Sequence, residues 1–567
     1  MTRRPARTGL LAVSLAPAAA LALAAALLLA GCGGGGERLT APPRGNQDIN
    51  PHDPATLRDG GDLRIPLDNL PTNYNYNTID GHEGQTHEVL SPLMPRAFKD
   101  APDGGVVLDT DFVTSAELVS PSPQVVRYHI NDRAVWSTGR PITWEDFAAQ
   151  VTANSGANPA YLIADKSGYQ DIATVQRGAT DKDVVVTFRK TFAEWQGLFY
   201  GLYPKETDAT PEAFNTGWIS SPQLTAGPFK VGTVDQTAKT ITMVRNERWW
   251  GERPRLDRVI FTVTDRNALA DRLANNEIDI YEIGSSIDLF RRAQGIPGVQ
   301  VRQATPKQFS HITFNGAPGA ILADLKLRTA IAKGIDRAAI ARRLIGGIVP
   351  TVAPMGNHIY PVGSKDYRDN SDVLPYDQAA ANRELEALGW VRPAPGAVRA
   401  RNGQPLRLRF VVPAGNPISD AISRTTLDQL AQIGVRIEID AVPTGQFFAN
   451  FVNVGNFDLT GFQWVQTSVP FSNSVGNYQE TKGADIGNNF GRIYDPRIGP
   501  LFAQGLAELD EAKRAEIGNQ VDRLIWEEVH DLPLYPQTGA FAVRATVANF
   551  GAKGLGDYDF EHAGFTQ

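Results

Sequence analysis

The fold class is decided by residues 406–441, which read LRLRFVVPAGNPISDAISRTTLDQLAQIGVRIEIDA. Apolar and arginine side chains alternate over 406–410, which is the period of a half-buried β-strand. A helix is expected from about Asp420 to Gly434, because its apolar residues recur on one side and glycine commonly ends a helix. Residues 435–441 alternate again as a second strand. This order predicts a β-α-β unit with parallel strands, and therefore an α/β fold.

Earlier in the chain a second stretch has the same order of elements. Residues 256–263 predict a buried strand, Asp265 is a candidate helix N-cap, and residues 278–283 predict another strand. A helix between the two strands would carry Leu269 and Leu273 on its apolar side. We therefore expect a second β-α-β unit in this stretch.

The length of the chain implies more than one body. It has 567 residues, of which 42% are hydrophobic and 21% charged, an ordinary composition for a folded protein. A single hydrophobic core rarely supports so many residues. The strand and helix patterns fall into two α/β bodies, over 60–295 and 310–530, joined around 295–315. A crevice between two such bodies is a common position for a ligand.

Charge and cysteine usage exclude several classes of protein. The formal net charge is −7, with 55 Lys and Arg against 62 Asp and Glu, which argues against nucleic acid as a partner. Cys32 is the single cysteine, so the chain has no intrachain disulfide and no multi-cysteine metal site.

The N-terminus has the parts of an export signal. Arg3, Arg4 and Arg7 precede an apolar stretch over 10–30, and the stretch ends in Leu29-Ala30-Gly31-Cys32. A membrane-spanning anchor is the alternative, since the stretch is long enough to cross a bilayer. The ending resembles the lipobox of bacterial lipoproteins, which implies removal of residues 1–31 and a lipid anchor on Cys32. Residues 32–57 are rich in glycine, proline and asparagine, and we expect them to form a flexible tether.

Motifs for catalysis are weak in this sequence. Residues 82–88 read HEGQTHE, but the second histidine is five residues from the first, whereas the zinc motif His-Glu-x-x-His needs four. A solvated turn is the other interpretation. Neither a nucleophile elbow nor a phosphate-binding glycine loop occurs at a strand–helix junction. An acid pair for glycoside hydrolysis stays open among 62 acids, because sequence spacing does not give spatial distance. We expect no catalytic residue, no metal and no cofactor.

Several segments, in order, resemble the family 5 extracytoplasmic solute-binding proteins, the oligopeptide, dipeptide and nickel receptors of ABC importers. The segments are WSTGRPITWEDF at 136–147, AGPF at 226–229, RNERWWG at 245–251, Phe314-Asn315, LKLRTAI at 325–331, GIDR at 334–337, Gly389-Trp390, Phe457-Asp458 and Trp464.

The resemblance implies a two-lobed periplasmic-binding-protein-like fold of type II, with a hinge and a ligand cleft between the lobes. Lobe I would comprise residues 58–305 with an inserted subdomain at about 85–215, and lobe II residues 306–535. The C-terminal residues 536–567 would return to lobe I. The protein would then be a monomeric receptor on the extracytoplasmic face of the cell membrane. It would deliver a peptide or another polar organic solute to a membrane permease.

The resemblance also implies where a ligand would lie. Three segments are expected to contact it: Tyr74, Asn75, Tyr76 and Asn77; Phe314 and Asn315; and Gln463, Trp464 and Gln466. Amides and aromatic rings suit a polar organic ligand, because amides donate and accept hydrogen bonds and rings stack on flat faces. The other interpretation is that these aromatics are core residues and the asparagines form turns.

One departure from the family concerns the ligand's charge. Peptide receptors of the family carry an acidic residue after this tryptophan, which pairs with the peptide's ammonium group. Residues 465–471 here read VQTSVPF and contain no acid. A buried ammonium group needs a carboxylate, so a free-amine peptide would require one from elsewhere, such as Asp68 or Asp80. Related actinobacterial lipoproteins are linked to phosphatidylinositol mannosides, so a role in envelope glycolipid assembly is the alternative function.

Overall fold

The computed structural model describes residues 47–483 and 486–567 of the chain. The expected signal segment 1–31, Cys32 and the expected tether up to residue 46 lie outside the described residues. Within the described part of the chain, every helix is too short or too polar to span a bilayer.

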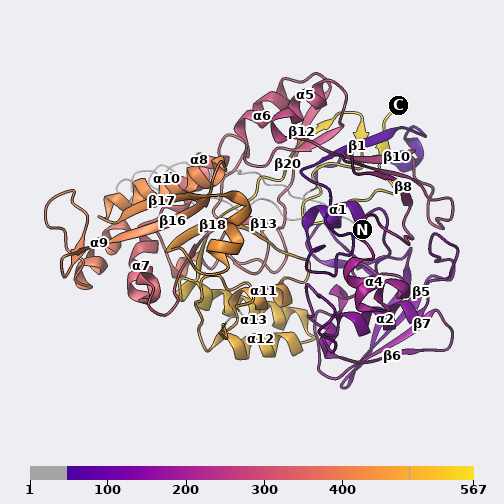
Figure 1. Ribbon diagram of the computed structural model, residues 1–567, viewed down its shortest axis with the longest axis horizontal. Helices are drawn as coiled ribbons and strands as arrows, with labels where there is room; N and C mark the ends of the chain where they lie inside the picture. Colours follow the sequence, from indigo (N-terminus) through magenta and orange to yellow (C-terminus); the bar gives the residue numbers. More distant parts are fainter. Residues whose placement is uncertain (1–46, 484–485) are drawn as a thin grey trace, which may run out of the picture. The chain divides into compact units, whose positions relative to one another are not determined.

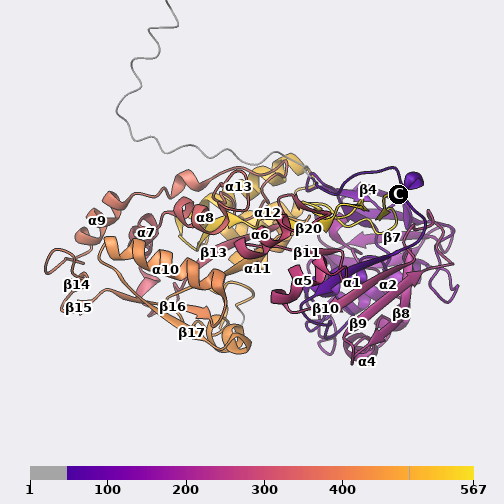
Figure 2. The ribbon, with the colours of Figure 1, turned by 90° about the horizontal axis from the view of Figure 1, so that it is seen from above.

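The stretch that predicts the fold class forms the expected parallel unit. β16 (Arg407–Pro413) leads into α10 (Pro417–Gln432) and then β17 (Arg436–Val442), and Leu408 lies opposite Ile437 in a parallel pair. Figure 2 shows α10 running along these two strands. The prediction of a β-α-β unit is confirmed.

Helix α10 begins three residues before the expected position. Asn416 Oδ1 accepts hydrogen bonds from the backbone N–H groups of Ile418 and Ser419, at 3.0 and 3.1 Å. Proline at position 417 has no N–H to satisfy and a φ suited to a first helical turn. A helix start is therefore favoured at Pro417, one turn ahead of the apolar stripe.

The second half of the chain is built on a five-stranded sheet in the order β17-β16-β18-β13-β19, of which Figure 1 labels the first four strands. Its other strands are β18 (Leu459–Val465), β13 (Gln308–Phe314) and β19 (Asp531–Pro536). One hydrophobic core joins this sheet to nearby helices, including α7 (Leu325–Lys333), α8 (Arg337–Ile345) and α9 (Gln378–Ala387). The aspartates at 324 and 336 cap α7 and α8. Other helices of this half are α11 (Pro470–Tyr478), α12 (Ile498–Ala507) and α13 (Glu511–Glu527).

The first half holds two four-stranded sheets on one shared core. One sheet has the order β1-β10-β9-β8, from β1 (Asp62–Leu67), β8 (Phe229–Asp235), β9 (Thr240–Arg245) and β10 (Arg258–Val263). The other has the order β4-β5-β7-β6, from β4 (Val113–Pro121), β5 (Gln124–Ile130), β6 (Ile172–Arg177) and β7 (Asp183–Phe188). Helices α1 (Gly84–Leu90), α2 (Trp144–Asn154), α3 (Lys205–Asp208) and α4 (Pro211–Thr216) and the hairpin of β2 (Phe98–Asp100) and β3 (Val106–Leu108) complete this half.

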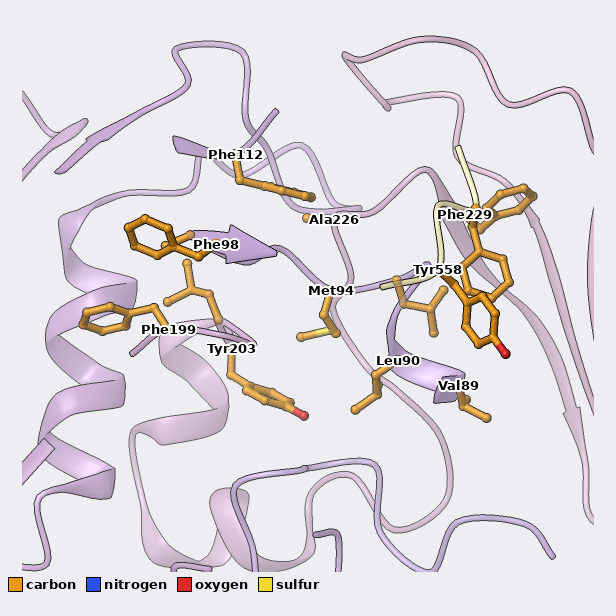
Figure 3. Packing of buried hydrophobic residues seen from close by; sticks show 14 of the residues in the cluster. Val89, Leu90, Met94, Phe98, Phe112, Phe199, Tyr203, Ala226, Phe229 and Tyr558 are labelled. Atoms are coloured by element: carbon orange, nitrogen blue, oxygen red, sulfur yellow. The ribbon is translucent and has the colours of Figure 1, made fainter. Parts of the chain in front are cut away.

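Buried side chains from both ends of the chain contribute to that core. Val89 of α1, Phe229 of β8 and Tyr558 near the C-terminus belong to the same cluster, and Figure 3 shows them gathered on one side of it. The core therefore ties the C-terminal segment to the first half of the chain.

The second predicted β-α-β unit is wrong as a sheet element. β10 and α5 (Leu269–Ala274) form near the expected positions, but β11 (Ile280–Glu282) does not join the sheet of β10. Strands β1 and β9 already occupy both edges of β10. β11 instead pairs antiparallel with β20 (Ala540–Arg544), whose other neighbour is β12 (Val299–Gln303). The helix pattern was correct, but it could not reveal a strand from the end of the chain.

Residues 48–57 differ from the expected flexible tether. The backbones of Asp48 and Ala552 exchange two hydrogen bonds, at 2.9 and 3.0 Å, and Leu57 is buried. Arg58 donates its backbone N–H to Phe565 at 2.9 Å, beside the short pair of β21 (Val547–Ala548) and β22 (Gly564–Phe565). Composition suggested a tether here, but partners near the C-terminus satisfy this backbone.

Candidate ligand-binding cavity

A cavity of about 730 Å³ lies where both halves of the chain meet the segments that connect them. The carboxyl end of β1, helix α1 and β11 line it from the first half, and the loop after β18 lines it from the second. The connections between the halves also line it, at Ala304, Pro306, Lys307, Gln308 and Gly539. A cavity of this size is typical of a small-molecule site.

Four rings form one wall of the cavity. Tyr76 lies 4.4 Å from His82 and 5.6 Å from His87, between ring centroids, and His87 stacks on Tyr200 at 5.3 Å. Burial lowers the pKa of His87 to about 4 and raises the pKa of Tyr76 to about 12. Both rings are therefore uncharged at neutral pH, and the wall can stack on a ligand or exchange hydrogen bonds with it.

A buried ionic network lies beside this wall. The Lys307 ammonium contacts Asp100 and donates to Ser468 Oγ at 2.5 Å, so it joins both halves of the chain. Tyr200 OH donates to Asp557 Oδ1 at 2.9 Å, and Arg96 Nη1 donates to Asp557 Oδ2 at 2.9 Å. Burial opposes the charge on Asp557, but Arg96 and Lys553 outweigh it and lower the pKa of its carboxyl. This part of the lining is charged but internally paired.

Carboxylates gather at another part of the lining. Asp68 follows β1, Glu88 belongs to α1 and Glu282 ends β11. Arg266 lies between two of them, with Nε 3.3 Å from Asp68 Oδ1 and Nη2 3.9 Å from Glu282 Oε2. Asp68, one of the two acids expected to replace the missing one after Trp464, therefore lines the cavity, whereas Asp80 does not.

Among the residues expected to contact a ligand, Tyr76 and Gln466 line the cavity. Gln466 Nε2 donates to the carbonyl of Ile359 at 2.8 Å, and its backbone N–H donates to the carbonyl of Lys307 at 2.7 Å. Its position is therefore fixed by the second half of the chain.

The neighbours of Tyr76 lie outside the cavity lining. Tyr74 is fully buried in the core, and Asn75 Nδ2 donates to the carbonyl of Phe214 at 2.9 Å. Asn77 is half-buried, and its backbone N–H donates to Asn75 Oδ1 at 3.2 Å. Asn75 therefore shapes the loop that presents Tyr76.

Phe314 and Asn315 also lie outside the cavity lining. Gln308 starts β13 and lines the cavity, and Phe314 ends the same strand, roughly 20 Å further along at the rise of a β-strand. Phe314 is buried in the core, and Asn315 Nδ2 donates to the carbonyls of Gly455 and Phe457. The two residues expected to contact a ligand therefore lie at the end of β13 that is far from the cavity.

Trp464 and Gln463 likewise differ from the expectation. Val465 lines the cavity, and successive side chains of a strand point to opposite faces, so the Trp464 ring faces away from Val465. The Trp464 ring stacks between His311 and Phe490, at 5.2 and 5.8 Å. Gln463 is exposed and does not line the cavity.

The largest omission of the sequence reasoning is the run of residues 82–88. The motif suggests only a metal site or a solvated turn, yet His82, His87 and Glu88 all line the cavity. The spacing of these residues gives no sign of this role. Their position in the first helix after β1 is a usable signal, because ligands of α/β proteins lie beyond the carboxyl ends of strands.

Comparisons with known proteins show the family to which the chain is similar. Residues 110–485 match the model of the bacterial extracellular solute-binding proteins, family 5. The oligopeptide-binding protein OppA of Mycobacterium tuberculosis is 44% identical over 553 residues, covering 95% of this chain and 91% of OppA. A probable monoacyl phosphatidylinositol tetramannoside-binding protein of the same organism, LpqW, is 24% identical over 467 residues, covering 76% of this chain and 71% of LpqW.

Two solved structures share the fold. A periplasmic EDTA-binding protein, EppA, superposes with a TM-score of 0.84 at 26% identity, covering 92% of this chain and 98% of EppA. The oligopeptide-binding protein AppA of Bacillus subtilis, in complex with a nonapeptide, gives a TM-score of 0.74 at 18% identity, covering 90% of this chain and all of AppA. The two-lobed α/β architecture expected from the sequence is thereby confirmed.

Proposed function

The chain belongs to the family 5 bacterial extracellular solute-binding proteins, and we propose that it captures peptides in this cavity for an ABC importer. The observation that carries the proposal is the 44% identity to an oligopeptide-binding protein along nearly the whole chain. The cavity supports it, because residues from both lobes and from both connections between them line one space.

The chemistry of the lining suits a peptide. Uncharged rings at Tyr76 and His87 offer stacking and hydrogen-bonding surfaces, and a peptide carries amide groups along its length. Carboxylates at Asp68 and Glu88 supply charge at one part of the lining. Binding would shift the lobes between open and closed arrangements and involve no covalent step, so we propose a receptor and not an enzyme.

The placement of the receptor is part of the proposal. A lipid on Cys32 would hold a monomeric body at the extracytoplasmic face of the membrane, where a permease accepts the peptide. A Cys32→Ser variant, compared with wild type by membrane fractionation, should lose its membrane attachment. Unchanged retention of that variant in the membrane would contradict the lipid anchor.

A peptide panel tests the function directly. The full-length chain, purified in detergent and freed of ligand, should bind one short peptide per molecule in calorimetric titrations over chains of three to five alanines. Native mass spectrometry of protein from which the ligand has not been removed should show the added mass of a bound peptide. The proposal fails if no peptide binds and the co-purifying molecule is a mannosylated phosphatidylinositol. That outcome would favour the role in envelope glycolipid assembly, which the similarity to LpqW supports.

A further inference from the structure

Glu88 is a half-buried acid in the lining of the cavity. Asp68 and Glu282 share the guanidinium of Arg266, at 3.3 and 3.9 Å. Glu88 lines the same cavity but makes no hydrogen bond or ion pair with any residue in 47–483 or 486–567. A half-buried carboxylate with no partner in the fold is expected to have one in a ligand.

The surroundings of Glu88 are short of positive charge. Asp68 and Glu282, the two partners of Arg266, face it from the first half of the chain, and Lys553 and Tyr558 face it from the C-terminal segment. The Lys553 ammonium lies 4.8 Å from the centre of the Tyr558 ring, and its charge adds to that of Arg266. With the tyrosine neutral, three carboxylates face two cations, so one more cation would balance the group.

Burial raises the pKa of Glu88 to about 7, and Glu282 and Asp68 act in the same direction while Lys553 opposes them. His87, the other titratable group on the same helix, has a pKa of about 4 and stays neutral over this range. The charge of Glu88 therefore changes near neutral pH in the empty cavity, while that of its helix neighbour does not.

The loop after β18 cannot supply the acidic partner used elsewhere in the family. Residues 465–471 contain no carboxylate, and Ser468 Oγ accepts a hydrogen bond from the Lys307 ammonium at 2.5 Å. The hydroxyl of Ser468 is therefore already used by Lys307, and the loop offers no carboxylate to an ammonium group. The acids of the first lobe are the available alternative.

We infer that Glu88, flanked by Asp68 and Glu282, binds an ammonium group of the ligand. This assignment rests on the proposed peptide-binding function and specifies which peptides are taken. The ammonium can be the free amino terminus of a peptide or the side chain of a lysine within it. A peptide that lacks both would leave Glu88 without a partner.

Calorimetry with matched peptides tests the assignment. The probes are tetra-alanine, N-acetyl-tetra-alanine, and N-acetyl-tetra-alanine with its first residue replaced by lysine, titrated into wild type, Glu88→Gln and Asp80→Asn. Asp80 is exposed and does not line the cavity, so its variant is the control. Acetylation of tetra-alanine should weaken its binding to wild type at least ~10-fold, since it removes the cationic partner. Glu88→Gln should weaken the unblocked peptide about as much and leave the acetylated one unchanged.

The pH dependence gives a second measurement. Wild type should bind tetra-alanine about tenfold more weakly at pH 5.5 than at pH 7.5, because Glu88 is protonated in the empty cavity at the lower pH. Glu88→Gln should lose most of this dependence, and Asp80→Asn should retain it. Recovery of binding by the lysine peptide would identify the side chain as one source of the ammonium.

Each contrary result has a distinct meaning. Equal binding of free and acetylated tetra-alanine to wild type, or unchanged binding of the free peptide to Glu88→Gln, overturns the ammonium assignment and leaves peptide binding standing. Failure of every peptide to bind any variant overturns the proposed function together with the assignment. Thermal unfolding monitors each variant, and Glu282→Gln replaces Glu88→Gln if the latter does not fold.

Discussion

Glu194 Oε2 accepts a hydrogen bond from the backbone N–H of Ser472 at 2.7 Å, at the start of helix α11. Glu194 Oε1 accepts another from Phe471 at 3.3 Å, and the guanidinium of Arg514 lies 3.9 Å away. Glu194 belongs to the first half of the chain, whereas the other three residues belong to the second. One buried carboxylate thus caps a helix across the two halves.

Replacing Glu194 by Gln should lower the free energy of unfolding by about 1–3 kcal/mol, because Arg514 and one helix N–H lose a charged acceptor in a buried place. Urea unfolding followed by fluorescence measures the change. Glu117→Gln, on the exposed face of β4 and without a side-chain partner among the described residues, is the matched control and should change stability by less than about 0.5 kcal/mol. Equal effects of the two variants would contradict the capping role.

The stability of the second half should fall in mildly alkaline solution because of His358. Burial alone would lower its pKa, but Asp531 and Asp522, 3.1 and 2.7 Å away, outweigh it and raise the pKa to about 9. A raised histidine pKa stabilises the fold below the unfolded value of 6.5 and loses that contribution as pH rises through 9.

The measurement compares wild type with His358→Gln by urea unfolding between pH 6.5 and 9.5. Wild type should be the more stable protein at pH 6.5, and its advantage should narrow by about 1–3 kcal/mol at pH 9.5. The exposed His52→Gln variant should show no such narrowing. An advantage of wild type that stays constant over this range would show that His358 is neutral in the folded protein.

Gly539 should not tolerate a side chain. It has φ +52° on the connection between β19 and β20, and a Cβ atom there would lie 1.7 Å from the carbonyl oxygen of Ala304. Gly539→Ala should therefore cost more than about 2 kcal/mol of stability, through a clash with backbone as well as strain. Gly415→Ala has a similar positive φ of +76° with open space around it, and should cost only about 1 kcal/mol. Equal losses of stability in the two variants would show that the clash with Ala304 does not cause the effect of Gly539→Ala.

Ligand binding should depend on Tyr76 more than on Trp464. Tyr76→Ala removes a ring from the cavity wall and should weaken peptide binding about tenfold in calorimetry. Trp464→Ala removes a ring held between His311 and Phe490, and should instead lower stability by about 2–4 kcal/mol. A larger loss of peptide affinity in Trp464→Ala than in Tyr76→Ala would indicate that the ligand binds on the face of the sheet that carries Trp464.

The sequence pattern was informative where the determining contacts are local. The alternation over 406–410 and 435–441 predicted β16 and β17, and the apolar side of the residues between them predicted α10, because strand and helix periodicity depend on near neighbours. Pairing of β11 with β20 could not be read in this way, since the two strands are about 260 residues apart in the chain. A local sequence pattern carries no information about a partner strand so distant in the chain.

The site follows the same division. The segments named from the family resemblance reach the cavity at Tyr76 and Gln466, but the choice between neighbouring side chains depends on strand phase and loop conformation. Trp464 and Val465 differ by one position and face opposite sides of the sheet. The contacts of Lys307 with Asp100, and of Arg266 with Asp68, join distant parts of the chain and needed the structure.

The pairing of Asp48 with Ala552 also has a consequence for the attachment of the body. Ala552 is directly followed by Lys553, which lines the cavity and whose carbonyl accepts a hydrogen bond from Gln47 Nε2 at 3.1 Å. If the proposed lipid on Cys32 anchors the body, its attachment and one wall of the cavity share this short segment.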